Sequence, residues 1–390
     1  MNILVLVSSS FPYGDAISSR MVSFCKLFSI TGNQVHVIAM RSKGGKKTNI
    51  NYTLDFCDYQ IAPSKKGSIK DSFFGNSKYV SMIKEYLENN HVDAVFSCGT
   101  EPYYKNLEKI CHKNHIPLYL EQCEWMDVSS YRFGKYDYRY IRRNQLILKG
   151  YKTVDGVVAI TRLLKDHFDK MGVPVVRIPT ILDVNNINPA LATNNKRITL
   201  IYTGNPSKSK EYMAPVINVL AEDEELRRKF EFHIYGPSRE RVIENIGGST
   251  KALDQAGDSV VIHGRVPQEE MEKIQREADF MLFIRPHRQS SDAGFPTKLG
   301  ESMSVGTPVI SNDTGDISLY LHNGVNGFLM RDGNEVEVRM TLMKILSLSN
   351  NEHKEMRRNA RKTAEESFDY HCYQREIRTL FNMVEKTGGE

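Results

Sequence analysis

The sequence predicts an α/β protein of two domains, each built around an open parallel sheet. Three observations support this prediction. The 390 residues are more than one core usually holds. In both halves, short buried-type apolar runs alternate with helical patterns. An Asn-rich segment with Pro189, residues 183–196, separates the two series. The predicted domains are residues 1–185 and 196–365.

In the first half, residues 2–8 form a continuously apolar run of the kind found in buried parallel strands. A loop and a helical stretch through Arg20 to Phe28 follow, and residues 34–39 complete a β-α-β unit. Further strands are predicted at residues 92–97, 117–121 and 156–160, each preceded by a helical pattern.

The second half repeats this alternation and ends in a strongly helical tail at residues 335–384. Its strands are predicted at residues 199–203, 231–235, 259–263, 280–284 and 308–311. The pattern of both halves predicts the fold class, but it does not by itself predict a reaction.

Composition and charge exclude several classes of protein. The longest apolar runs are far below the roughly 18 residues that a membrane-spanning helix needs, and the N-terminus lacks the pattern of a signal peptide. Six cysteines show no metal-type spacing, which favours free thiols in a reducing cytoplasm. Residues 1–190 carry 25 Lys and Arg against 17 Asp and Glu, so the first domain favours an anionic partner. A pI of about 8.7 is too mild to indicate nucleic acid.

Residues 294–312 predict a loop, a short helix, a turn and a strand. Pro296 suits the first helical position, and Gly306 suits the left-handed position after the helix. The free N–H groups at the helix start form an anion site. Lys298 and Glu301 lie three residues apart on one helical face, where a cation suits a diphosphate and a carboxylate suits ribose hydroxyls. A solvated ion pair is the alternative.

This segment, with Gly-Phe-Pro-Thr-Lys-Leu-Gly-Glu-Ser followed by Gly-Thr-Pro-Val-Ile, resembles the nucleotide-sugar site of retaining glycosyltransferases of the family-four (glycosyl transferases group 1) type. The resemblance implies the GT-B architecture, in which two Rossmann-like domains face each other across a cleft. It also implies that a final helix, residues 366–390, packs on the N-terminal domain. Glu301 would hold the donor's ribose. Many members carry a glutamate near the transferred sugar at the slot that Ala293 occupies here, which is a departure from the family pattern.

The resemblance also implies contacts from other loops. After the first strand of the second domain, Lys210 matches a phosphate-binding lysine, whereas Asn205 replaces the usual arginine and Lys208 offers a substitute charge. Glu124 occupies in part the place of a reaction-centre histidine. The predicted catalytic residues are Lys298, Lys210 and Glu124. The predicted donor-binding residues are Gly14, Asp15, Gly204, Asn205, Lys208, Arg265, Arg285, Gly294, Phe295, Pro296, Thr297 and Glu301. Arg20 and Trp125 are predicted to bind the acceptor.

Solvated loops and ordinary core packing remain alternatives for most of these residues. The segment at residues 131–152 interleaves tyrosines with Arg and Lys, which suits a membrane surface or an anionic lipid-linked acceptor as well as a solvated helix face. The lysine-rich loops at residues 43–47 and 65–70 point weakly the same way.

The resemblance therefore implies a retaining glycosyltransferase, which we expect in the cytoplasm or on the inner face of the membrane. It would use a nucleoside-diphosphate sugar, in the first place a UDP-sugar, and a glycan or lipid-linked acceptor in surface polysaccharide synthesis. We expect no cofactor, no metal and no nucleic-acid partner. A nucleotide-sugar epimerase of the same fold and a non-catalytic nucleotide-sugar-binding protein are the alternatives.

Overall fold

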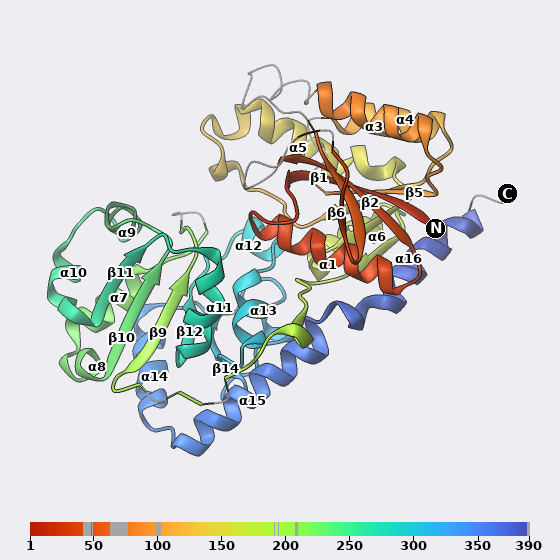
Figure 1. The fold of residues 1–390 in the computed structure, drawn as a ribbon. Coiled ribbons are helices and arrows are strands. Elements are labelled where there is room, and N and C mark those ends of the chain that lie inside the picture. Colours follow the sequence, from red (N-terminus) through yellow and green to blue (C-terminus); the bar gives the residue numbers. More distant parts are fainter. Residues whose placement is uncertain are drawn as a thin grey trace. The chain divides into compact units, whose positions relative to one another are not determined.

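The computed structural model describes residues 1–41, 48, 50–62, 77–98, 103–190, 192–193, 195–206 and 210–387. The chain divides into two compact units (Figure 1). Unit 1 comprises residues 1–183 and 370–390, and unit 2 comprises residues 184–369. The predicted fold class, two Rossmann-like domains with parallel sheets, is confirmed.

The sheet of unit 1 has the strand order β3-β4-β2-β1-β5-β6-β7-β8, and every pair except β3 with β4 is parallel. Five successive residues of β1, residues 3–7, are buried, as the apolar run predicted. The strand order reverses between β1 and β5, because β2 to β4 lie on one side of β1 and β5 to β8 lie on the other. The strands are β1 (Asn2–Ser10), β2 (Gln34–Arg41), β3 (Tyr52–Leu54), β4 (Cys57–Ile61), β5 (Ala94–Cys98), β6 (Leu118–Gln122), β7 (Gly156–Ala159) and β8 (Val175–Arg177).

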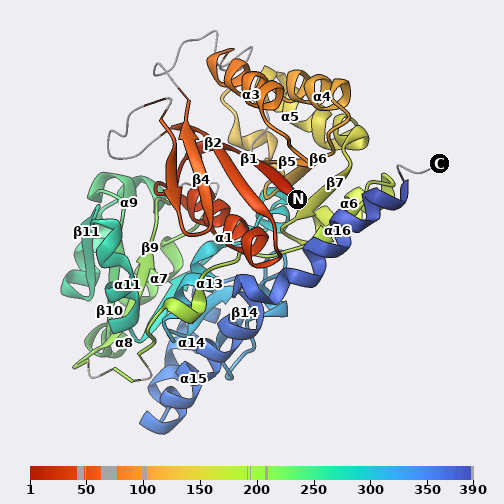
Figure 2. The same ribbon diagram turned by 45° about the vertical axis from the view of Figure 1, so that its right-hand side comes forward.

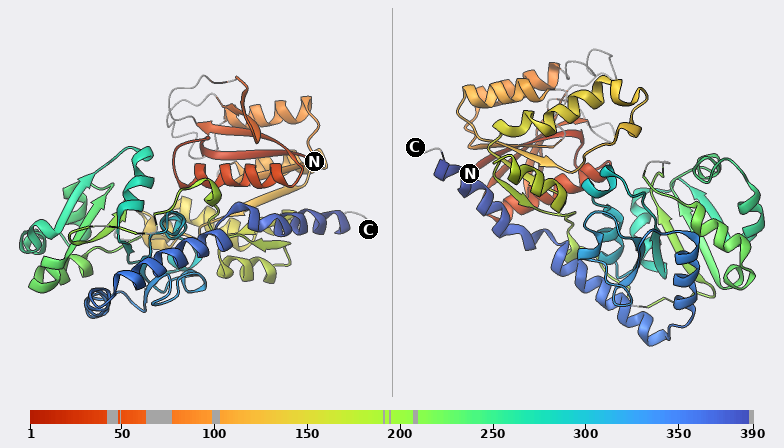
Figure 3. Two further views of the ribbon diagram at one scale, coloured as in Figure 1. Left: turned by 60° about the horizontal axis from the view of Figure 1, so that its bottom comes forward. Right: turned by 180° about the vertical axis from the view of Figure 1, so that it is seen from behind.

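Helices cover both faces of this sheet (Figures 2 and 3). On one face, α1 and α16 contact each other, and on the other α3 and α4 do so. In the core between α1, the sheet and α16, Phe381 lies 5.8 Å from Phe28 and 4.8 Å from Tyr119, measured between ring centroids. The helices are α1 (Ala16–Ile30), α3 (Ser77–Asn89), α4 (Tyr104–Lys113), α5 (Tyr138–Leu148), α6 (Arg162–Lys170) and α16 (Gln374–Thr387).

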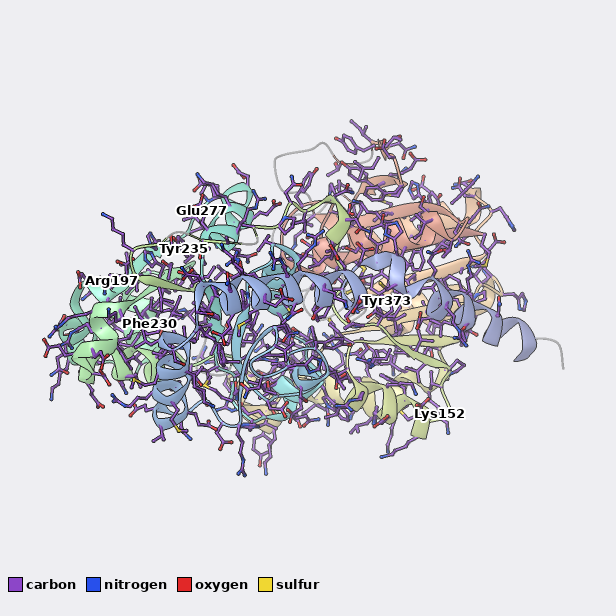
Figure 4. The ribbon with its side chains drawn as sticks, turned by 90° about the horizontal axis from the view of Figure 1, so that it is seen from below. Lys152, Arg197, Phe230, Tyr235, Glu277 and Tyr373 are labelled. Carbon is purple, nitrogen blue, oxygen red and sulfur yellow. The ribbon has the colours of Figure 1, made fainter. Side chains whose placement is uncertain are left out.

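The sheet of unit 2 is fully parallel, with the order β11-β10-β9-β12-β13-β14. Its strands are β9 (Ile198–Thr203), β10 (Phe230–Tyr235), β11 (Val260–Gly264), β12 (Phe280–Phe283), β13 (Val309–Asn312) and β14 (Gly327–Met330). Phe230 and Tyr235 mark the two ends of β10 in Figure 4, where Arg197 donates a 2.7 Å hydrogen bond to the Phe230 carbonyl. The strand order reverses between β9 and β12, and such a point is where open α/β sheets bind ligands.

Two groups of helices flank this sheet: α7 contacts both α10 and α14, and α13 contacts both α11 and α15. The helices of unit 2 are α7 (Ala214–Glu222), α8 (Glu224–Lys229), α9 (Arg239–Asn245), α10 (Lys251–Ala256), α11 (Gln268–Glu277), α12 (Gln289–Ala293), α13 (Thr297–Ser304), α14 (Glu335–Leu346) and α15 (Asn350–Ser367). Among the described residues, no helix combines the length and apolar character needed to cross a membrane.

The structure corrects several boundaries. Residues 186–190 lie in unit 2 and not in a free linker, because Arg361 donates to the Ile187 carbonyl and Arg357 donates to the Ala190 carbonyl. The predicted helical tail is three helices, α14, α15 and α16. The chain re-enters unit 1 at Tyr370, four residues after the predicted boundary, and its N–H donates to the Leu182 carbonyl at 3.0 Å.

Candidate active site

Two glycines bring the backbone turns after β9 and β10 into contact at the carboxyl edge of the unit 2 sheet. Gly204 has a φ of +139°, and Gly236 has a φ of +116°. A Cβ added at Gly236 would lie 1.9 Å from the Gly204 carbonyl oxygen, so no side chain fits there. The Gly204 N–H donates to the Tyr235 carbonyl at 3.0 Å. The backbone of Gly204 and Gly236 therefore forms a surface without side chains beyond β9, next to the point of strand reversal. We call this surface the glycine floor.

Lys298 lies over this floor and forms an ion pair with Glu211. Its Nζ is 2.7 Å from Glu211 Oε1, with side-chain exposures of 16% and 8%. The Tyr202 hydroxyl donates to the other oxygen of Glu211, and Lys298 Nζ lies 5.1 Å from the centre of the Tyr202 ring. Burial raises the pKa of Glu211, but the charge and hydrogen bond of Lys298, with Tyr202 and Arg285, outweigh it and leave that pKa below its ordinary value.

The position of Lys298 depends on the absence of a side chain at Gly204. A Cβ at Gly204 would lie 2.9 Å from Lys298 Cε and 3.0 Å from Nζ. The predicted donor residue Gly204 and the predicted catalytic residue Lys298 are therefore direct neighbours, and any larger residue at position 204 would displace the ammonium group.

Helix α13 carries Lys298 in its first turn. We expected Pro296 to be the first residue of the helix, but it is the residue before it. The helix begins at Thr297 and has no side-chain cap. Uncapped N–H groups at such an end attract anions. At the other end Gly306 has the predicted left-handed conformation, with a φ of +81°, and a Cβ there would lie 2.9 Å from the Ala190 carbonyl oxygen.

Glu301 lies one turn further along α13, on the side of Lys298. Burial raises the pKa of Glu301, and this effect outweighs the opposing influence of Lys298 and of hydrogen bonds with Thr297 and Gln275. The alternative of an ion pair between Lys298 and Glu301 is not the main contact, because Lys298 pairs with Glu211 instead. Glu301 is thereby left as a partly desolvated carboxylate, available to a hydroxyl donor.

Arg285 follows β12 on the other side of the strand reversal. Asn312 fixes its backbone in both directions, accepting from the Arg285 N–H and donating to its carbonyl, each at 2.8 Å. The guanidinium donates to the Gly294 carbonyl at 3.3 Å. Burial lowers the pKa of Arg285, while the charges of Glu211 and Asp292 act in the opposite direction. A second cation is thus held near the Lys298 and Glu211 pair.

The slot at residue 293 contains no carboxylate. Ala293 is fully buried in α12, a short helix that the sequence did not indicate. The neighbouring Asp292 accepts a hydrogen bond from the Gly315 N–H at 3.0 Å, which ties it to the loop after β13.

The remaining donor residues predicted in unit 2 lie in varied surroundings. Phe295 is buried, and its ring packs edge-on against Tyr320 with centroids 5.4 Å apart, so its side chain belongs to the core. Asn205, Lys210 and Arg265 are exposed. Lys208 lies outside the described residues.

In unit 1, several predicted site residues have internal partners. Asp15 caps α1 by accepting from the Ser18 N–H at 3.0 Å, and a Cβ at Gly14 would lie 2.8 Å from Ser10 Cβ. Arg20 is buried, pairs with Glu121 at 2.7 Å, and donates to the carbonyls of residues 178 and 179. This geometry gives Arg20 a structural role within unit 1, and its contact with an acceptor stays a prediction.

The two predicted residues after β6 are more accessible. Glu124 is exposed, whereas Trp125 is half-buried and donates from its indole N–H to Asn144 Oδ1 at 3.0 Å. The Trp125 ring also lies 4.6 Å from that of His167.

Sequence reasoning missed Glu211, Tyr202 and Asn312. Glu211 gave no signal because it lies in a polar loop beside Lys210, and its burial results from contacts with Tyr202 and Lys298. Asn312 was seen only as the residue that follows a strand. None of the three stands at a motif spacing, so only the folded arrangement shows that they support Lys298 and Arg285.

Comparison with known proteins agrees with this geometry. Residues 197–347, which contain the whole cluster, match the family model described as "Glycosyl transferases group 1". A curated relative, the amylovoran biosynthesis glycosyltransferase AmsK of Erwinia amylovora, is 32% identical over 91 residues. That segment is 23% of this chain and 22% of AmsK, so the match spans about a fifth of the relative's length.

Solved structures resemble the whole chain. Sucrose-phosphate synthase from Thermosynechococcus elongatus has a TM-score of 0.77 at 13% identity and covers 99% of both chains. Anabaena HepE in complex with UDP and glucose has a TM-score of 0.69 at 14% identity and covers 100% of both. At such identities the likeness establishes the fold, which is GT-B. Residues 197–347 of unit 2 thus match the glycosyl transferases group 1 family, and the chain as a whole has the GT-B fold.

Proposed function

We propose that the protein transfers a sugar from a nucleoside-diphosphate sugar to a glycan or lipid-linked acceptor with retention of configuration. The observation that carries the proposal is the placement of Lys298. Its ammonium lies in the first turn of the uncapped helix α13, above the glycine floor after β9 and near the partly buried Arg285. Cations and free helical N–H groups that converge at the carboxyl edge of a parallel sheet suit a diphosphate.

These groups also suit the reaction. As the bond between the sugar and the diphosphate breaks, negative charge grows on the leaving oxygen. Lys298, the start of α13 and the exposed Lys210 stabilise that charge, so we propose that departure needs no metal ion and no cofactor. Glu211 holds Lys298 in place before the donor arrives, and the donor's phosphates then share the ammonium with it.

Glu301 is proposed to bind the nucleoside part of the donor. A partly desolvated carboxylate one turn beyond Lys298 accepts hydrogen bonds from paired ribose hydroxyls. We propose UDP as the nucleotide. Support comes from the solved structures of HepE, which contain UDP or UDP-glucose.

Ala293 bears on how the configuration is retained. Because this slot offers no carboxylate to attack the sugar, we propose a front-face reaction without a covalent intermediate. Glu124 and Trp125, after β6 in unit 1, are proposed to act at the reaction centre and on the acceptor. The name of AmsK supports an acceptor from polysaccharide biosynthesis.

Product analysis tests the proposal and separates it from its alternatives. Purified protein is incubated with a panel of UDP-, GDP- and ADP-sugars and an extract of glycan and lipid-linked acceptors. Free UDP together with a new glycoside is the expected result, and the anomeric configuration of that glycoside tests retention. A new nucleotide sugar without free UDP would mean an epimerase, and binding without turnover would mean a nucleotide-sugar-binding protein.

A membrane contact is proposed for the segment around α5, on the cytoplasmic side. Phe133 and Tyr136 are 65% and 77% exposed, and Arg132 and Lys135 lie beside their rings. The arginines within α5 are a poorer choice, because Arg142 and Arg143 are half-buried and Arg139 pairs with buried Asp137 at 2.8 Å. Exposed aromatic rings with flanking cations suit an anionic lipid surface.

We expect the fourfold variant Arg132→Gln, Phe133→Ser, Lys135→Gln and Tyr136→Ser to lose binding to anionic vesicles. Each cation near such a surface is worth about 1 kcal/mol, so the two charges alone account for a roughly 30-fold loss. Co-sedimentation with phosphatidylglycerol vesicles at low and high salt measures this. The matched control, Lys105→Gln with Lys109→Gln on α4, removes the same charge from another exposed surface. Equal pelleting of both variants and the wild type would contradict the proposed contact.

A further inference from the structure

Two cysteines and a glutamate converge at the carboxyl edge of the unit 1 sheet. Cys98 is the last residue of β5, Glu121 lies near the end of β6, and Cys123 follows β6 directly. The strand register pairs Cys98 with Glu121, and Cys123 is two residues further on, so the three side chains point to the same side of the sheet. Their two sulfurs and a carboxylate oxygen all lie within 4.8 Å of one another.

The carboxylate of this cluster is held in one orientation. Arg20 binds Glu121 Oε1 at 2.7 Å, and the same guanidinium donates to the backbone carbonyls of residues 178 and 179. The other oxygen, Oε2, accepts a 3.0 Å hydrogen bond from Cys98 Sγ. One oxygen is thus engaged by an arginine that is itself fixed, and the second oxygen faces the sulfurs. Metal-binding carboxylates are commonly oriented by this kind of outer hydrogen bond.

We propose that Cys98, Cys123 and Glu121 bind a thiophilic divalent cation, Zn²⁺ in the first place. Binding releases the two thiol protons to solvent, and the metal is then held by two thiolate sulfurs and Glu121 Oε2. The two thiolates and the carboxylate carry three negative charges, which the divalent cation and Arg20 balance. Cys98 and Glu121 are buried, and a buried charge is tolerated when it is compensated in this way.

The coordination number also fits. Zn²⁺ prefers four tetrahedral ligands, and sites with three protein ligands leave the fourth position to water or another small ligand. Cys123 is only partly buried, and we propose that a water molecule takes this fourth position. The site belongs to unit 1, whereas the Lys298 cluster belongs to unit 2.

The proposal is tested on the reduced, full-length protein after treatment with a chelator. Zn²⁺ is titrated in competition with a chromogenic chelator, and Co²⁺ is used to observe thiolate-to-metal charge-transfer absorption. We expect one equivalent to bind. Cys98→Ser and Cys123→Ser should each weaken binding at least 100-fold and remove the charge-transfer band. Cys111→Ser, a buried cysteine of the same unit outside the cluster, is the matched control and should bind like the wild type.

A second measurement covers the risk that a variant misfolds. Glu121→Gln leaves Arg20 buried without its anion, so circular dichroism is recorded for every variant, and Zn²⁺ should raise the thermal unfolding midpoint of the wild type and of Cys111→Ser only. No stoichiometric binding, or equal binding in folded Cys123→Ser, would overturn the site. Loss of two titratable thiols in air without any metal binding would show a disulfide-forming pair in its place and would also overturn it.

Discussion

At the scale of single residues, Lys298 is tied to stability as well as to the proposed chemistry. Its partner Glu211 is buried. Removing the Lys298 ammonium therefore leaves the Glu211 carboxylate in the interior without a compensating charge. Mutating Lys298 alone therefore confuses two effects. A pair of variants separates them.

Lys298→Met should lower the turnover number by about 10²–10³ and destabilise unit 2 by roughly 3 kcal/mol. Adding Glu211→Gln should restore much of the stability, because the neutral amide no longer needs a cation, but it should not restore turnover. Steady-state kinetics and thermal unfolding on the same preparations measure both quantities. Normal turnover in a folded Lys298→Met variant would remove this lysine from the proposed mechanism.

We expect the ionised Glu301 side chain to lower the stability of the folded protein but to strengthen UDP binding. Because its folded-state pKa is raised, the folded protein holds the Glu301 proton more tightly than the unfolded chain does, and its contribution to stability declines as the pH rises through that pKa. Glu301→Gln should therefore raise the unfolding midpoint at pH 8, and the gain should vanish below about pH 4. The same change should weaken UDP binding about tenfold, as measured by calorimetry. Unchanged UDP affinity would count against the ribose contact.

At the scale of elements, the turns after β9 and β10 form one interlocked unit. Gly236→Ala would drive a methyl group into the Gly204 carbonyl and shift the floor beneath Lys298, so we expect a loss of both UDP binding and thermal stability. Gly248→Ala is the matched control. Gly248 also has a positive φ, of +89°, but a Cβ there meets nothing within 4 Å, so only backbone strain of about 1 kcal/mol should appear. Similar losses in both variants would mean that strain, not the contact, matters.

The predictable elements are those with a strong local pattern. The buried runs of β1, β9 and β12 and the Gly306 turn were evident because apolar stretches and turn residues specify them locally. The strands at or next to a sheet edge, β3, β4, β8 and β14, were not predicted, since three- to five-residue segments gain their structure from pairing with a neighbour.

The same distinction applies to the sites. Lys298, Glu301 and Gly204 belong to segments with readable motifs, whereas Glu211 and the Cys98, Glu121 and Cys123 cluster are assembled from distant positions. The spacing of the cysteines along the chain gave no sign of a metal site, because such motifs consist of residues close together in the sequence. The structure joins Cys98 and Cys123 across two neighbouring strands instead.

At the scale of the whole molecule, unit 1 is completed by residues that follow unit 2 in the sequence. Ile377 and Leu380 of α16 are fully buried in the unit 1 core. A chain ending at Asp369 should therefore keep unit 2 folded but lose several kcal/mol in unit 1, since each deleted side chain of this kind contributes about 2 kcal/mol or more. Limited proteolysis with mass spectrometry should show cleavage concentrated in residues 1–183. The double variant Ile377→Ala with Leu380→Ala is a milder test of the same contact, and resistance of the shortened chain would contradict it.

This arrangement also sets an order of events on the ribosome. Domains of a growing chain generally fold from the N-terminus onward, but here the first 183 residues must wait for α16, while residues 184–369 form a continuous unit that can close as soon as it emerges. At about 5–20 residues per second, unit 1 stays incomplete for on the order of ten seconds or more after its own sheet strands have been made. During that interval the surface of β7 and β8 that α16 later covers is open to chaperones and to other nascent chains. At elevated temperature, we therefore expect the nascent chain to aggregate more readily than the completed, folded protein.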